Sequence, residues 1–447
     1  MVALKSMSWP RLKVPARLFE EVLVSKGGRS IITINGYRAG RPVLILSNAL
    51  SGGGAEVVAR LMVARISTAS CVLFENDAGI TLSGKRIKTA YRQYRAGIWL
   101  TALVNLWRLV YIQWAKICLR PVATISHLEG PNIANMLTVM GGRRVLFVHN
   151  CISQSYSGHG VRNKVKRYLC SCLYSRAKAL VAVSPGVEQE LVQSLGVDSA
   201  KVMVLPNPVD IEAIKRAADC LYGDYRDLLC ETRYMISVAS LTKQKNHEQM
   251  LRVYAHLISN SQDCASLKLV LLGDGPLRSE LQNLCQQLSL RFFNLQQSGG
   301  FDSDAQVYFL GFQENPYRLI SQAELLLMTS RWEGLPIALL EAMSLGIPSV
   351  VSDCSEGIRD LWQLPVVDEN NHKEGPPVLE TAFGVLMPRI IENSIAVEDW
   401  AQEVEKLLCD PVKRDGCSIA CRHRAKRYDI DQVAELWSHV ISPEVRA

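Results

Sequence analysis

Short apolar runs alternate with amphipathic stretches along both halves of the chain. The runs in the first half span residues 43–47, 70–74, 123–126, 145–148 and 179–183. Those in the second half span residues 234–239, 267–272, 307–310, 325–328 and 348–352, with helical patterns between them, among others at 246–259, 277–288 and 336–345. Short, uniformly apolar runs are typical of parallel strands buried on both faces. The pattern therefore predicts an α/β fold of two facing, doubly wound parallel-sheet units with a cleft between them.

A chain of 447 residues is too long for one ordinary hydrophobic core and fits two domains of roughly 200 residues each. We expect the join after the segment Pro206-Asn207-Pro208, because two prolines favour an extended crossing. The predicted division is a basic extension at 1–41, a first Rossmann-like unit at 42–208, a second at 209–395 and terminal helices at 396–447. We expect those terminal helices to pack back across the domain interface.

Charge is divided unevenly along the chain. The first 200 residues carry 26 Lys and Arg against nine Asp and Glu, whereas the remainder carries 24 against 34. A basic half favours an anionic partner, such as a phosphorylated substrate or a membrane surface. No zinc-finger or RNP-type motif is present, so nucleic acid is not expected as a partner.

The stretch Ala96–Leu119 is apolar and contains three tryptophans, but Arg108 and Lys116 interrupt it. Two interpretations stay open: a half-buried helix of the first unit, or a basic amphipathic helix lying on the cytoplasmic face of a membrane. No window of about 20 residues is free of charge, so we expect no transmembrane helix.

The thirteen cysteines include no C-x-x-C pair, which favours reduced, mostly buried thiols over a zinc site. No Asp-x-Asp stands in a metal-binding context. We therefore expect no obligatory metal or other cofactor. We expect the protein in the cytoplasm, bound peripherally at the inner face of the cell membrane.

The segment that runs from Ser330 to Glu341 carries the most specific chemistry. A strand at 325–328 leads into a loop, and Pro336 suits the first position of the helix that follows. The free N–H groups and positive dipole end of that helix suit a diphosphate. Glu333 lies in the loop and Glu341 about 8 Å inside the helix. Carboxylates so placed can accept hydrogen bonds from hydroxyls at opposite ends of one elongated ligand, such as a sugar nucleotide.

Ser-Arg-Trp-Glu-Gly-Leu-Pro, followed by Glu341-Ala-Met, resembles the E-x7-E signature of retaining glycosyltransferases with the GT-B fold. These enzymes form the large family, of the family-four type, that builds bacterial polysaccharides and lipid-linked oligosaccharides. The resemblance implies that Glu341 binds the ribose hydroxyls and that Glu333 contacts the donor sugar. It also implies that the N–H groups of Gly334 and Leu335 face the sugar and phosphates.

Other segments resemble the family in the same order along the chain. Gly53 and Gly54 lie in a glycine loop after the first strand, and His149 follows a strand where the family has a histidine near the donor sugar and acceptor. The resemblance implies a diphosphate clamp of Arg and Lys. Lys245 fits the Lys, whereas Ser240 stands where the Arg is usual.

Two further points follow from the resemblance. Asn315 lies in the loop expected near the nucleobase. Lys243 and Arg331 are both candidates to replace the missing clamp cation, and the sequence does not decide between them.

The resemblance implies transfer of a hexose or N-acetylhexosamine, with retention, from a nucleotide sugar, UDP- or GDP-linked, to a glycan or a polyprenyl-diphosphate-linked acceptor. His149, Glu333 and Lys245 are the expected catalytic residues. The alternatives are a soluble glucan synthase, a sugar-nucleotide epimerase, or an inactive donor-binding partner protein, which the serine at position 240 would suit.

Overall fold

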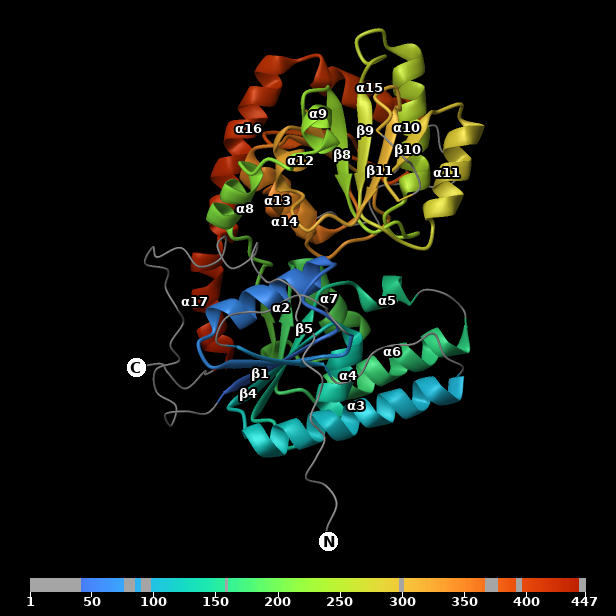
Figure 1. Cartoon of the computed structure of the whole chain (residues 1–447). Helices are drawn as coiled ribbons and strands as arrows, with labels where there is room; N and C mark the ends of the chain where they lie inside the picture. The colour runs from blue at the N-terminus through green and yellow to red at the C-terminus, as the bar shows by residue number, and fades with distance from the viewer. Residues whose placement is uncertain are drawn as a thin grey trace.

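The computed structural model describes residues 42–75, 85–89, 98–156, 160–296, 301–365, 377–390 and 396–441. Two separate sheets, one of seven strands and one of eight, form two layered domains that lie one above the other (Figure 1). The observed class is α/β with two parallel-sheet units, which confirms the predicted fold class.

The first domain is built on a sheet with strand order β3-β2-β1-β4-β5-β6-β7, in which every neighbouring pair is parallel. Its strands are β1 (Val43–Ser47), β2 (Ala69–Leu73), β3 (Arg86–Thr89), β4 (Ala123–His127), β5 (Arg143–Val148), β6 (Ala179–Ala182) and β7 (Val202–Val204). The five strands β1, β2, β4, β5 and β6 supply most of its core.

Helices cover both faces of this sheet. They are α2 (Gly54–Arg65), α3 (Ile98–Leu119), α4 (Glu129–Leu137), α5 (Ile152–Ser155), α6 (Val161–Tyr174) and α7 (Pro185–Gln189), with short turns η1 (Glu190–Ser194) and η2 (Ser199–Lys201). The stretch singled out for its tryptophans is α3, which packs on the sheet through Ile112 and Ala115. No helix in the described part of the chain is long and apolar enough to cross a bilayer.

The second domain has the strand order β10-β11-β9-β8-β12-β13-β15-β14, in which only the edge strand β14 runs antiparallel to its neighbour. Its strands are β8 (Tyr234–Val238), β9 (Lys268–Leu272), β10 (Phe292–Asn294), β11 (Val307–Gly311), β12 (Leu325–Met328), β13 (Ser349–Ser352), β14 (Leu379–Thr381) and β15 (Gly384–Met387). The switch in strand order between β8 and β12 places their carboxyl ends beside one crevice, where doubly wound folds bind ligands.

The helices that pack on the second sheet precede, separate and follow its strands. They are α8 (Ile211–Ala218), α9 (Tyr225–Cys230), α10 (His247–Asn260), α11 (Arg278–Gln287), α12 (Tyr317–Ser321), α13 (Ile337–Leu345), α14 (Glu356–Leu361), α15 (Ala396–Leu408) and α16 (Pro411–Ala425). The helix α13 begins one residue later than predicted. Pro336 is its N-cap, in an extended conformation, and its carbonyl accepts a hydrogen bond from Leu340 N.

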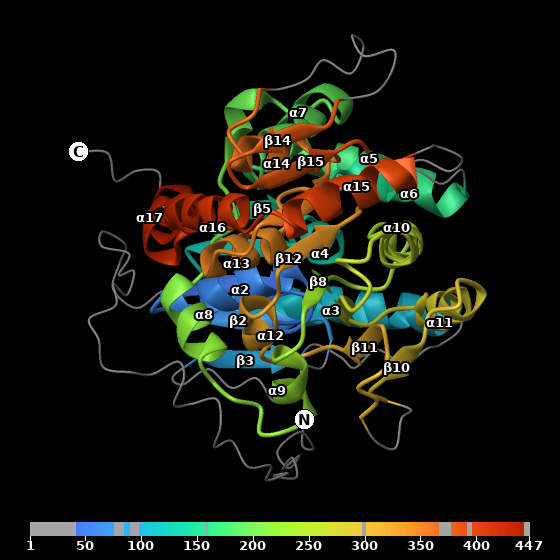
Figure 2. The ribbon, with the colours of Figure 1, turned by 90° about the horizontal axis from the view of Figure 1, so that it is seen from above.

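The chain crosses between the domains twice. After α16 and the turn η4 (Lys426–Tyr428), the helix α17 (Ile430–Ile441) packs against α2 and β5 of the first domain, as Figures 1 and 2 show. The two crossings pair through Val209, whose N–H donates to Tyr428 O at 2.9 Å and whose carbonyl accepts from Ile430 N at 2.8 Å. Buried Arg65 of α2 contacts Asp431 at 2.6 Å and Asp210 at 3.7 Å, so one cation holds both crossings.

The apolar runs predicted ten strands, and all ten are present, at β1, β2, β4, β5, β6, β8, β9, β11, β12 and β13. The helical interpretation of the chain after residue 396 is also confirmed. Five short strands were not predicted, namely β3, β7, β10, β14 and β15. Four of these are edge strands and β15 lies next to one, at positions where burial on both faces is no longer required and the apolar pattern weakens.

Candidate active site

The predicted donor loop lies between β12 and α13, at the edge of the second domain that faces the first. Glu333 is buried in it. Its Oε1 accepts a hydrogen bond from Lys245 Nζ at 2.5 Å and another from Ser330 Oγ at 2.7 Å. The pairing explains how a carboxylate is tolerated there, because a buried charge needs an opposite charge and hydrogen bonds to offset its desolvation.

Lys245 belongs to the loop between β8 and α10, and that loop is fastened to the donor loop by the backbone. Arg331 N donates to Gln244 O at 2.8 Å, and Gln244 Nε2 donates to Trp332 O at 2.9 Å. Thr329 Oγ1 donates to the carbonyl of Asn246, which has a left-handed backbone conformation. The two loops therefore hold the Lys245–Glu333 pair as one unit.

The candidates for the missing clamp cation are placed differently. Ser240 and Lys243 are both exposed. Arg331 is half-buried, and its Nε lies 3.4 Å from Asn246 Oδ1. Of the cations considered, Lys245 is the one with a direct contact to the predicted sugar-binding carboxylate.

Glu341 is also buried and faces the β11–α12 side of the crevice. Tyr317 OH donates to its Oε1 at 3.0 Å. Burial raises the pKa of Glu341 to about 7, while the Tyr317 hydrogen bond and the guanidinium of Arg60 in α2 act in the opposite direction. Asn315, expected near the nucleobase, uses its amide on the protein: Nδ2 donates to Ala217 O at 2.8 Å and Oδ1 accepts from Tyr317 N at 3.2 Å. It thus fixes the start of α12, which carries Tyr317.

The raised pKa of Glu341 predicts pH-dependent nucleotide binding. If only the carboxylate accepts ribose hydroxyls, a pKa of about 7 leaves roughly a tenth of the protein competent at pH 6 and roughly nine tenths at pH 8. We expect UDP to bind about tenfold more tightly at pH 8 than at pH 6, measured by titration calorimetry. Glu341→Gln should bind more weakly with a flat pH profile, and an equal slope in this variant would assign the titration to another group.

The raised pKa of Glu341 also makes the stability of the fold depend on pH, but stability falls as the pH rises whereas nucleotide binding strengthens. Because the folded-state pKa of Glu341 lies above its ordinary value of 4.5, its contribution is fully favourable below pH 4.5 and is lost as the pH rises to 7. The loss is roughly 3 kcal/mol. The melting temperature of Glu341→Gln relative to the unmodified protein should therefore rise between pH 5 and pH 8.

His149 follows β5 and is buried, with its ring stacked on that of His127 at the end of the neighbouring strand β4. The two rings share a hydrogen bond between His127 Nδ1 and His149 Nε2 at 3.0 Å. Burial lowers the pKa of His149 to about 4, opposed by its interaction with the Asn207 side chain. The ring is therefore neutral near pH 7.

Asn207 joins this histidine pair to the donor loop. Its Nδ2 donates to Leu335 O at 2.8 Å, across the domain interface. The polar chain thus runs from β4 and β5 of the first domain, through the first crossing segment, to the donor loop of the second. The crossing segment, which its two prolines led us to expect, also carries a side chain that contacts the donor loop.

Glycines allow the domains to approach each other at the donor loop. A Cβ on Gly334 would lie 2.0 Å from the His149 carbonyl oxygen. A Cβ on Gly54 would lie 3.2 Å from Ile337 at the start of α13. The N-terminal ends of α2 and α13 therefore lie close together. Neither N-cap, Gly53 or Pro336, uses a side chain to cap its helix. The starts of two helices, one from each domain, are therefore near one another without a side-chain cap.

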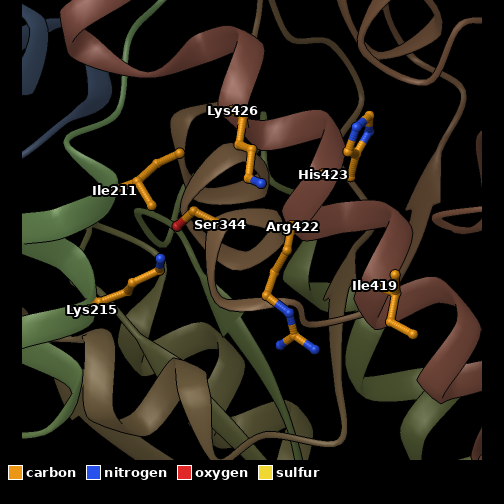
Figure 3. Close-up of a pocket in the computed structure, with 7 residues that line it drawn as sticks. All are labelled: Ile211, Lys215, Ser344, Ile419, Arg422, His423 and Lys426. Carbon is orange, nitrogen blue, oxygen red and sulfur yellow. The ribbon is translucent and has the colours of Figure 1, made fainter.

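A separate hollow of about 390 Å³ lies between α8, α13 and α16 (Figure 3). Ile211, Lys215, Ser344, Ile419, Arg422, His423 and Lys426 line it, and none of the predicted donor residues does. Two of its cations have partners already, since Lys215 pairs with Glu212 at 3.3 Å and Arg422 donates to Leu345 O at 3.1 Å. We assign no ligand to it.

No group of three or more His, Cys, Asp or Glu side chains that could hold a metal comes together among the described residues. Three residues of the site were not singled out from the sequence: Ser330, Tyr317 and His127. Ser330 and Tyr317 are close in sequence to predicted residues. For His127, the available signal was a histidine at the end of a predicted strand, the same signal that His149 gave.

Comparison with known proteins agrees with this architecture. Residues 52–213 match the model of Glycosyltransferase Family 4, and residues 229–373 match the model of glycosyl transferases group 1. One match covers much of the first domain and the other much of the second. Fold, site and matches together define a glycosyltransferase enzyme with the GT-B fold. Within that class, the chain belongs to the family-four type, as its E-x7-E segment indicated.

The relatives of this chain include two bacterial glycosyltransferases of stated activity. The chain is 28% identical over 310 residues to the Campylobacter jejuni N-acetylgalactosamine-N,N'-diacetylbacillosaminyl-diphospho-undecaprenol 4-alpha-N-acetylgalactosaminyltransferase, covering 69% of this chain and 72% of the relative. It is 29% identical over 222 residues to the lipopolysaccharide 1,6-galactosyltransferase of Escherichia coli, covering 49% and 54%.

Solved structures share the fold at low identity. Anabaena Alr3699/HepE in complex with UDP-glucose matches 90% of this chain and 99% of its own, with a TM-score of 0.64 and 17% identity. WaaG, a glycosyltransferase involved in lipopolysaccharide biosynthesis, also matches 90% and 99%, with a TM-score of 0.64 and 13% identity. These matches support the two-domain GT-B architecture.

Proposed function

We propose that this glycosyltransferase moves a hexose or N-acetylhexosamine, with retention of anomeric configuration, from a UDP- or GDP-sugar to a lipid-linked glycan. The observation that carries the proposal is the ion pair between half-buried Lys245 and buried Glu333 at the domain interface, with Glu341 on the same segment as Glu333. A cation, two carboxylates and two helix starts in one crevice match the parts of a sugar nucleotide.

Each part of the site has one task in this proposal. Lys245 and the N–H groups at the starts of α2 and α13 stabilise the negative charge that develops on the leaving diphosphate. Glu341 accepts the ribose hydroxyls, with Tyr317 holding its carboxyl in place. When the diphosphate draws Lys245 away, Glu333 is released to accept hydrogen bonds from the sugar.

Retention requires that the acceptor attack on the same face from which the diphosphate leaves. The leaving phosphate oxygen would take the proton of the acceptor hydroxyl, so no protein nucleophile is required. The new bond joins the acceptor oxygen to the anomeric carbon while the anomeric carbon–phosphate oxygen bond breaks. No step needs a metal ion, because Lys245 and the helix N–H groups carry the electrostatic role.

The acceptor class is supported by the relatives. The Campylobacter jejuni relative is named for a diphospho-undecaprenol substrate, and the first 200 residues of this chain are strongly basic. A lipid diphosphate presents negative charge at a membrane surface, which a basic first domain would attract. We therefore propose peripheral association with the cytoplasmic face of the membrane.

A panel of sugar nucleotides tests the donor and the reaction together. UDP, GDP and ADP are first compared for their effect on the melting temperature, because a ligand of the folded state raises it. The sugars of the stabilising nucleotide are then offered with a polyprenyl-diphosphate-linked sugar, and the anomeric configuration of the product is read by NMR. An inverted product would refute retention, whereas binding without transfer to any acceptor would favour a donor-binding partner protein.

A further inference from the structure

Exposed apolar side chains gather on one face of the first domain. Among the described residues, 21 large apolar side chains are exposed. Seven of these are on α3, three are at the end of α4 or just after it, and four are on α6. We call this set the α3–α6 face: Leu100, Leu103, Leu106, Trp107, Val110, Trp114, Ile117, Leu137, Val139, Met140, Val161, Val165, Tyr168 and Leu169. An apolar surface gathered in this way marks an interaction site, unlike apolar residues scattered singly.

The helix α3 presents its apolar stripe away from the sheet. Its exposed apolar positions 100, 103, 107, 110, 114 and 117 recur every three or four residues, so they follow one side of the helix. The opposite side packs on the sheet through Ile112 and Ala115, and only in the second half of the helix. In the first half, residues 100–107 are exposed except for half-buried Val104. Figure 1 shows α3 along the margin of the first domain that lies farthest from the second.

Hydrogen bonds join the three parts of the face into one surface. Gln113 of α3 donates through Nε2 to Val139 O at 3.3 Å and accepts through Oε1 from Val139 N at 2.9 Å. Asn132 of α4 donates to Tyr174 OH of α6 at 3.2 Å. The helix α4 thus links α3 on one side and α6 on the other.

The charges on this face have one sign. The helices α3 and α6 contain six Lys and Arg and no Asp or Glu. On α3 the cations serve the fold, since Arg108 donates to Phe74 O at 2.7 Å and Lys116 is buried. On α6, Lys164 and Arg167 are exposed. Exposed tryptophans on the same face as exposed basic side chains are typical of a surface that lies in the interface of an anionic membrane.

We propose that the α3–α6 face docks on an anionic lipid bilayer. This inference rests on the proposed function only for the identity of the acceptor. A second copy of the chain is a poorer occupant, because two copies of one basic, acid-free face would repel each other. The position also fits a lipid-linked acceptor: α5 and α6 follow β5, the strand that His149 directly succeeds. The docking face therefore continues from the segment that borders the candidate site.

Vesicle flotation with the full chain tests the face. We expect binding to vesicles that contain phosphatidylglycerol, weak binding to phosphatidylcholine alone, and release at high salt. Leu103→Glu combined with Trp107→Glu should reduce binding at least tenfold. Lys164→Gln and Arg167→Gln should each reduce it about fivefold. The matched control is Val412→Glu combined with Leu221→Glu, two exposed apolar positions outside the face, which should bind as the unmodified chain does.

The outcomes separate this proposal from the proposed function. All variants should keep UDP binding and transfer to a short-chain, water-soluble acceptor, while the α3 variant should lose transfer to an acceptor embedded in vesicles. Equal vesicle binding by the α3 variant and its control would overturn the docking face. If the α3 substitutions convert a dimer to a monomer and vesicle binding is kept, the partner of the α3–α6 face is a second copy of the chain and not a membrane. Intact docking without transfer to either acceptor would refute the proposed function alone.

Discussion

Replacing Lys245 by methionine is expected to lower kcat/KM for the sugar nucleotide by about 100- to 1000-fold. The Lys245 ammonium contacts the buried Glu333 carboxylate at 2.5 Å, and Ser240, where the family has an arginine, contributes no charge. In the proposed function, Lys245 is therefore the cation of the unmodified protein that stabilises the leaving diphosphate, together with the helix N–H groups. A single charge at the partly buried position of Lys245 stabilises developing charge more than it would in bulk water.

The loss of catalysis in Lys245→Met can be distinguished from a loss of folding. Removing Lys245 alone leaves Glu333 buried without its counter-charge, which is itself destabilising. The double variant Lys245→Met/Glu333→Gln removes both charges and should regain melting temperature but not activity. Lys243→Met, two residues away and exposed, makes the same charge change outside the pair and should keep activity within about twofold. Equal losses from Lys243→Met and Lys245→Met would mean that general positive charge, and not this contact, serves the reaction.

The hydrophobic pattern predicted the central strands because those strands are buried on both faces. β1, β2, β4, β5 and β6 could be recognised for this reason. The edge strand β3, with the sequence Arg-Ile-Lys-Thr, pairs on one side only and is mostly exposed. Nothing in its composition separates it from a charged loop, so its pairing with β2 could be found only from the folded sheet.

The candidate site was predictable where one short segment holds its chemistry. Glu333, Glu341 and the start of α13 are contiguous in sequence, so their spacing carried the prediction. The contacts to residues distant in sequence were not predictable, since Lys245 and Glu333 are 88 residues apart and Asn207 and Leu335 are 128 apart. The role of His127 depends on the parallel register that pairs it with Phe147, two residues before His149.

The Ala96–Leu119 stretch shows that the hydrophobic pattern of a helix does not reveal what its apolar side contacts. An apolar stripe on a helix has the same sequence whether it faces a sheet or a membrane. The structure shows that α3 uses Ile112 and Ala115 for the sheet and leaves its tryptophans at 107 and 114 exposed. The two interpretations therefore apply to opposite sides of one helix. One side packs on the sheet, and the vesicle experiment tests whether the other side binds a membrane.

Gly334→Ala is expected to reduce kcat/KM by roughly 100-fold while leaving each domain folded. The added methyl would lie 2.0 Å from the carbonyl oxygen of His149 in the other domain. A backbone carbonyl at the end of a buried strand cannot move aside, so the domains must separate to relieve the contact. A displacement of about 1 Å between reacting groups is enough to lower a rate by about 100-fold.

Matched glycine variants distinguish the separation of the two domains from destabilisation by an added methyl group elsewhere. A Cβ on Gly384 in β15 would lie 1.9 Å from Ser349 O, within the second domain, so Gly384→Ala should lower the melting temperature of that domain. Gly416 in α16 has no neighbour within 4 Å of an added Cβ, and Gly416→Ala should leave both activity and stability intact. For Gly334→Ala, small-angle scattering with UDP bound should give a larger radius of gyration than for the unmodified chain. An unchanged radius of gyration with full activity would contradict this prediction. The two domains would then tolerate a side chain at position 334 without moving apart, and the close approach of Gly334 to His149 would not be required for transfer.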